Sequence, residues 1–335
     1  MKKAVMVLLL VGIAAGSAFA QLTFSGEAHA GVQLQRVYGE DAAISAMHRE
    51  YGAPKFDFTA TVMRQNYGAR LDTTFQMTTD PGAHFTLNGI YGWAAFLDNA
   101  LRLTMGQISS PVWVTRLDAS LPEFRFDEIR GFRIEYATPL EGLSVGAAFR
   151  ADDLSLRQFA EQIIFGATFI HPLFNAVFAY DVGRDTNALL GFNFTGIPDL
   201  TAGFQLQATN LAIWDNVAFG SPGLIRTYYK VGYRIMRPLN VYLIAGLRLF
   251  ARPGAEPEWM VAPGVTYRFL SNLTGEFRIS LDNYEGSPNN NLTILAALEY
   301  TLRGPAILYV EYEMRLDNME RANHTFGFGI TIRAF

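Results

Sequence analysis

The side chains in this sequence that could do chemistry are charged groups rather than nucleophiles or metal ligands. The five histidines show no metal-ligand spacing such as His-Glu-x-x-His. A hydrolase needs a base beside a nucleophile, and no serine lies close in sequence to His324. The chain has no cysteine. We therefore predict no enzyme activity, no cofactor and no metal.

One stretch of the chain, residues 109–129, gathers charges of both signs. Carboxylates and guanidinium groups that face each other across a narrow water-filled passage set its ion preference. If this stretch folds inward, its carboxylates would face arginines on a surrounding wall. The alternative is an ordinary exposed loop. The candidate residues are Asp118, Glu123, Asp127 and Glu128 on the acidic side, and Arg70, Arg102, Arg130 and Arg133 on the basic side.

The elements that must position these charges are β-strands. Apolar and polar residues alternate from Leu22 to Gln35, and the pattern recurs over 70–77, 241–249 and 308–316. Successive side chains of a strand point to opposite faces, so each segment has one apolar and one polar face. A soluble β-sandwich could alternate as well. The length and number of the segments favour strands that span a membrane.

Turn signals separate short connections from longer ones. Eight short turns and nine longer loops predict an all-β fold, a transmembrane antiparallel β-barrel of 18 strands with short periplasmic turns and longer outer loops. A barrel of 16 strands is the alternative, because loops 79–83 and 184–187 are short. The short turns lie at 65–66, 97–100, 139–142, 171–172, 196–199, 237–240, 271–272 and 303–305, and the other long loops at 39–54, 109–129, 151–160, 210–224, 252–258, 283–290 and 317–323.

The amino terminus indicates export. Lys2 and Lys3 precede an apolar run that ends in Ala18-Phe19-Ala20, so residues 1–20 are predicted to be a cleaved signal peptide. Half of the residues are hydrophobic, yet no later run reaches the 18 apolar residues of a spanning helix. We expect residues 21–335 to form the barrel, in contact with the lipid of a bacterial outer membrane.

Aromatic residues mark one end of the predicted barrel. Amphipathic rings favour the membrane–water interface, where a barrel collects them into a girdle. The strands that run toward the short turns end in an aromatic residue on the expected lipid-facing parity. These residues are Trp93, Tyr136, Phe169, Phe194, Tyr267 with Phe269, and Tyr300.

The same parity places charges of both signs on the lumen face in near balance, so the whole lumen offers no strong selectivity. The formal net charge of −4 argues against nucleic-acid binding. The expected inward cations are Arg70, Arg102, Arg133, Arg150, Lys230, Arg234, Arg248, Arg268, Arg278, Arg315 and Arg333, and the inward carboxylates are Glu27, Asp57, Asp72, Glu135, Asp181, Glu276, Asp282, Glu299, Glu311 and Glu313.

Residues 85–150, approximately, resemble a known protein family. The stretch Gly89-Ile90-Tyr91-Gly92-Trp93, followed by 101–107, resembles the general diffusion porins of Gram-negative bacteria. In that family a third loop follows, folds into the barrel and forms the constriction, and the 109–129 stretch has this place. Gln107 stands where the family has an arginine. The resemblance implies a homotrimer.

Together these features predict a porin, a water-filled channel for passive diffusion of small hydrophilic solutes and ions. Two alternatives belong to other classes. An outer-surface adhesin or receptor barrel would bind a partner through its long loops and would not conduct. A barrel hydrolase would turn over substrate in detergent.

Overall fold

The computed structural model describes residues 21–46, 53–77, 83–109, 112–117, 121–126, 129–151, 163–183, 187–210, 223–251, 254–283, 290–302 and 305–334. The expected signal peptide, residues 1–20, lies outside these ranges. Within them, no helix is long and apolar enough to cross a membrane.

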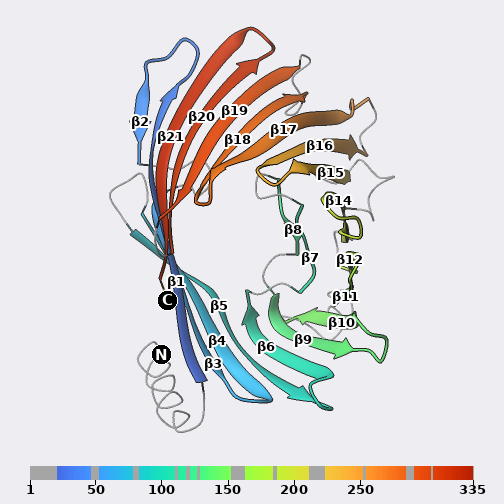
Figure 1. Ribbon diagram of the computed structural model, residues 1–335. Helices are drawn as coiled ribbons and strands as arrows, with labels where there is room; N and C mark the ends of the chain where they lie inside the picture. Colours follow the sequence, from blue (N-terminus) through green and yellow to red (C-terminus); the bar gives the residue numbers. More distant parts are fainter. Residues whose placement is uncertain are drawn as a thin grey trace.

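Eighteen antiparallel strands form one closed barrel (Figure 1). β1 (Gln21–Arg36) closes it by pairing with β3 (Lys55–Met63) and with β21 (Arg321–Ala334). The 18-strand prediction is confirmed, and the 16-strand alternative is wrong. The remaining wall strands are β4 (Tyr67–Met77), β5 (Ala83–Phe96), β6 (Leu101–Ile108), β9 (Ile129–Ala137), β10 (Leu143–Arg150), β11 (Ile163–His171), β12 (Phe174–Asp181), β13 (Asn187–Phe194), β14 (Leu200–Thr209), β15 (Leu224–Met236), β16 (Leu239–Phe250), β17 (Glu258–Leu270), β18 (Leu273–Asp282), β19 (Asn291–Thr301) and β20 (Ala306–Asp317).

Three short strands are not full wall strands. β2 (Ala43–Ser45) pairs with the outer end of β1. β7 (Val114–Thr115) and β8 (Phe124–Arg125) pair with each other in a separate two-stranded sheet. Because β7 and β8 follow β6 and precede β9, they belong to the 109–129 loop.

The connections follow the expected alternation of short and long. In the turn between β5 and β6, Leu97, Asp98 and Asn99 all have positive φ, at 53°, 54° and 71°. Asp and Asn tolerate this left-handed backbone better than most residues, which suits them to a tight turn. The last outer connection is shorter than expected, because β20 continues to Asp317 and β21 begins at Arg321.

The outer face of the barrel is apolar, as the alternation predicts. Leu243 and Val231 lie opposite each other on β16 and β15 and are 46% and 48% exposed. Of the expected girdle, Tyr136, Tyr267 and Tyr300 are exposed, as is Phe269. Large exposed apolar side chains on one parity are what a lipid-facing wall requires.

A β-bulge corrects one expectation on β5. Asp72 lies opposite Gly89 and Thr73 opposite Leu87, so Asn88 is an extra residue. An extra residue reverses which side chains face outward beyond it. Ile90 is exposed on the outer face. Trp93 has the opposite parity and faces the lumen, where the guanidinium of Arg102 lies 4.9 Å from the centre of its ring. The prediction that Trp93 faces lipid is therefore wrong.

Candidate functional site

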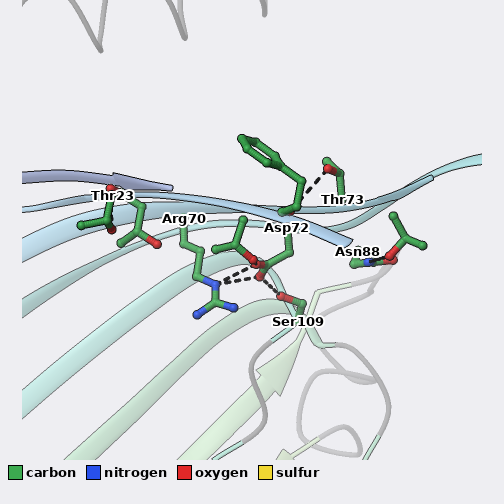
Figure 2. Close-up of polar contacts among 10 residues, drawn as sticks. Thr23, Arg70, Asp72, Thr73, Asn88 and Ser109 are labelled. Carbon is green, nitrogen blue, oxygen red and sulfur yellow. Dashed lines mark hydrogen bonds and ion pairs between the residues drawn. The ribbon is translucent and has the colours of Figure 1, made fainter. Parts of the chain in front are cut away.

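The 109–129 loop leaves the wall at a buried carboxylate, Asp72 of β4, whose side chain is 10% exposed. Arg70 donates through Nε to both carboxylate oxygens of Asp72, at 2.8 and 2.9 Å (Figure 2). Thr59 of β3 donates to Oδ1 at 2.7 Å. Ser109, the first residue of the loop, donates its hydroxyl to Oδ2. Asp72 thereby connects two wall strands to the start of the loop.

Polar side chains also hold the bulge beside this carboxylate. The Asn88 amide donates to the Thr74 hydroxyl at 2.6 Å. Gln107 of β6 donates to the backbone carbonyls of Leu87 and Asn88, at 3.0 and 3.2 Å. Gln107 thus bonds to the backbone of the extra residue and of the residue before it.

The described parts of the loop, 112–117 and 121–126, lie against the inner face of the wall. Trp113 is 4% exposed, and a Cβ built on Gly146 of β10 would lie 3.3 Å from its ring. The ring centroid of Phe124 lies 5.6 Å from that of Tyr228 on β15. Gln205 of β14 donates to the carbonyl of Pro122 at 3.0 Å. Figure 1 accordingly shows β7 and β8 within the ring of wall strands.

We call the inner face of β10–β15 that the loop contacts the covered wall. Ile164, Ala179 and Leu189 on this face are wholly buried and belong to one apolar cluster with Trp113 and Phe124. Their chain neighbours on the outer face, such as Phe165, Phe178 and Leu190, are exposed. Strands β11–β13 are therefore apolar on both faces here, with the loop covering the inner face.

The opposite side of the lumen remains open. A cavity of about 830 Å³ separates the loop from the inner faces of β3–β6 and β9, which we call the open wall. Phe126 and Trp113 border it from the loop side. The described part of the chain contributes seven charged residues to its border: Lys55, Asp57, Arg70, Asp72, Arg125, Arg130 and Arg133.

Three of the four candidate arginines border this cavity. Arg70 contacts Asp72, and Arg133, which is 4% exposed, pairs with Glu135 at 2.9 Å. Arg130 borders the cavity from the outer end of β9. Arg102 lies nearer the short turns, where its guanidinium packs on Trp93. The structure therefore brings Arg70, Arg130 and Arg133 together and leaves Arg102 below them.

Of the candidate carboxylates, only Glu123 lies in a described part of the chain. Its oxygens lie 3.9 Å from Arg116 and 3.4 Å from Arg125, so its ion pairs are with arginines of the loop itself. Asp118, Asp127 and Glu128 lie outside the described residues. Elsewhere in the lumen, wall charges pair with each other, as in Arg150–Asp181 at 2.8 Å.

Sequence reasoning missed one residue of this site, Lys55, and one contact, between Ser109 and Asp72. Lys55 borders the cavity and lies 3.2 Å from Asp57. Lys55 lies two residues before Asp57 and therefore faces the same side of the strand. Continuing the alternation of β3 back to this residue would have identified it. Strand parity placed Asp72 in the lumen, but nothing in the sequence marked it as the hydrogen-bond partner of Ser109. Among the described residues, no group of three or more side chains could hold a metal ion.

Comparison with known proteins gives a likeness in fold. No family model and no curated protein sequence matches the chain. Pseudomonas aeruginosa OccK5 (OpdH) matches with a TM-score of 0.62 and 10% identity over 94% of this chain and 99% of that one. P. aeruginosa OprD gives 0.59 and 11%, over 94% and 95%. The outer membrane channel DcaP of Acinetobacter baumannii gives 0.55 and 12%, over 95% and 98%. At these identities the likeness shows a shared fold, an antiparallel β-barrel of the architecture found in those porins.

Proposed function

We propose that this chain is an outer-membrane porin, a water-filled channel for passive diffusion of small hydrophilic solutes and ions. The observation that carries the proposal is the division of the lumen between a loop packed on one wall and a charged cavity against the other. A barrel of this size leaves an aqueous channel unless something fills it. The likeness to outer-membrane channels supports the same reading.

We further propose that the 109–129 loop forms the constriction, and that the constriction prefers anions. Among the residues that the structure describes, the cavity is bordered by five basic ones, Lys55, Arg70, Arg125, Arg130 and Arg133, and two acidic ones, Asp57 and Asp72. Charge at a narrow point controls which ions enter. Neutralising Asp118, Asp127 and Glu128 of the same loop should strengthen the preference for anions.

The setting of the channel is part of the proposal. Residues 1–20 direct export, and the exposed apolar outer face contacts lipid of the outer membrane. The homotrimer implied by the resemblance to general porins stays a prediction, which chemical cross-linking in native membranes would test.

Planar-bilayer recording tests the proposed function. The refolded barrel should produce discrete conductance steps and should let small sugars into liposomes in a swelling assay. An adhesin barrel would show neither conductance steps nor uptake of sugars. A barrel hydrolase would turn over substrate without conducting. Absence of steps from a barrel shown to be folded by heat-modifiability on a gel would contradict the proposal.

A further inference from the structure

Three glycines on the covered wall face three alternate residues of the loop. Gly166 of β11 lies under Trp113, Gly191 of β13 under Thr115 and Gly203 of β14 under Leu117. The loop residues are two apart, as along one side of an extended chain. Each therefore meets a different glycine as the loop crosses from strand to strand.

Space, rather than backbone conformation, makes these positions suit glycine. None of the three glycines has a positive φ, so the backbone would accept an L side chain at each. A Cβ built on Gly166 would overlap the indole of Trp113, and one on Gly203 would overlap the end of Leu117. A Cβ on Gly191 would lie 2.6 Å from Cγ2 and 3.1 Å from Cβ of Thr115.

The glycines lie on the lumen face. Gly166 pairs with Ala179 and Gly191 with Gln205, and both of these partners are buried under the loop. Packed interiors respond to the addition of even one methyl group. A side chain at any of the three positions would therefore move the loop away from the covered wall and toward the cavity.

We propose that Gly166, Gly191 and Gly203 form a seat that fixes the path of the 109–129 loop and thereby sets the cross-section of the channel. The effect on the channel cross-section rests on the proposed porin function. Pore size would then depend on wall positions that carry neither charge nor a hydrogen-bonding side chain.

A cross-link tests the seat without reference to conduction. The chain has no cysteine, so Thr115→Cys combined with Gly191→Cys gives a single cysteine pair. Their Cβ atoms would lie 3.1 Å apart, a few tenths of an ångström short of the roughly 3.5–4.5 Å that a disulfide spans. Mild oxidation of the folded barrel should join them, seen as a mobility shift of the unfolded, non-reduced chain.

The matched control combines Thr115→Cys with Gly232→Cys. Gly232 lies on β15 near the short turns, and a Cβ there would have Thr201 and Tyr242 as its nearest side chains. This pair should remain reduced. No cross-link in the first pair, or equal yields in the two pairs, would overturn the seat.

Conductance tests the consequence for the channel. Gly166→Ala should lower single-channel conductance, because the displaced indole moves toward the cavity. Adding Trp113→Ala removes the overlapping ring and should restore conductance toward the wild-type value, whereas Gly232→Ala alone should leave it unchanged. Wild-type conductance in Gly166→Ala, or no recovery in the double variant, would refute the link to pore size. If the Thr115→Cys, Gly191→Cys variant cross-links but the wild-type barrel never conducts, the porin function would be refuted and the seat would stand.

Discussion

The covered wall and the open wall belong to one lumen, but the inward side chains that characterise them differ in charge. The covered wall presents Ile164, Ala179 and Leu189, all wholly buried, whereas the open wall presents Arg70, Asp72 and other charges around a cavity. Both walls belong to the same sheet, and both carry exposed apolar side chains on their outer faces. The difference lies in what covers the inner face.

The inner face of this barrel carries charged side chains around the water-accessible cavity and mostly uncharged ones where the loop packs on it. Where the loop packs on the wall, apolar contacts replace hydration, and a buried charge there would lack compensation. Where the cavity remains, charges keep water and ionic partners. The selectivity of the channel should therefore depend on the open wall, and its geometry on the covered wall.

The largest contrast should come from placing the same charge on each wall. Leu189→Glu puts an unpaired carboxylate into the apolar cluster, which costs several kcal/mol and should expel the loop. Thr74→Glu puts it beside the cavity, where water can solvate it. Bilayer recording should show unstable, altered conductance for Leu189→Glu and a modest shift toward cations for Thr74→Glu. Similar behaviour of the two variants would remove the distinction between the walls.

A smaller loss is expected from truncating the loop's own anchor. Phe124 is 2% exposed against Tyr228, so Phe124→Ala should weaken the packing of the loop by about 3 kcal/mol. Trypsin should then cut the folded barrel faster after Arg116 or Arg125. The control is Phe328→Ala on the outer face, where the ring is 46% exposed. Equal cleavage rates in both variants would contradict the packing of this segment.

Asp72 and Asp57 provide a matched pair on the open wall. Each borders the cavity, and Asp57 accepts a hydrogen bond from Thr74, but of the two only Asp72 receives one from a described residue of the loop, Ser109. Asp72→Asn should weaken the start of the loop by about 1.5–3 kcal/mol, because hydrogen bonds to a charged group are lost. Both changes should shift the reversal potential toward anions, but only Asp72→Asn should add open-channel noise. Noise in Asp57→Asn as well would mean that Asp72 has no special role in holding the loop.

The smallest effect should come from exposed wall pairs outside both regions. Arg333 lies 3.1 Å from Glu27, with its side chain 61% exposed. Such pairs contribute about 0–1 kcal/mol. Arg333→Gln should therefore leave the temperature of the heat-modifiability transition and the conductance close to wild type. A large drop in either would show that these wall pairs do more than solvated surface pairs.

The sequence predicted the barrel because most strands alternate clearly. Segments such as 22–35 and 308–316 show one apolar face, and turn residues such as Asp98 and Asn99 mark their ends. The strand count followed from these two signals. The reversal at Asn88 could not be predicted, because a bulge is set by partner strands and leaves no fixed pattern in a single sequence.

The site was predictable in part. Strand parity placed Arg70 and Arg133 in the lumen. It does not distinguish lumen-facing side chains that contact water from those that the loop covers. Over 163–194 the alternation fails, since Ile164 and Phe165 are both apolar, as are Leu189 and Leu190. A strand that is apolar on both faces has both faces covered. That loss of alternation was the available signal for a loop inside the barrel.

The central claim, that charges on the open side of the lumen govern permeation, is tested most directly by the reversal potential in a potassium chloride gradient. We predict that the wild-type channel prefers anions. Lys55→Gln with Arg125→Gln, which removes two cations beside the cavity, should move the potential toward cations. Arg64→Gln, in the short turn between β3 and β4, should change little, because mobile ions screen an exposed charge within about 10 Å at 0.1 M salt. A cation-preferring wild type, or equal shifts from Arg64→Gln and from the double variant, would contradict the account.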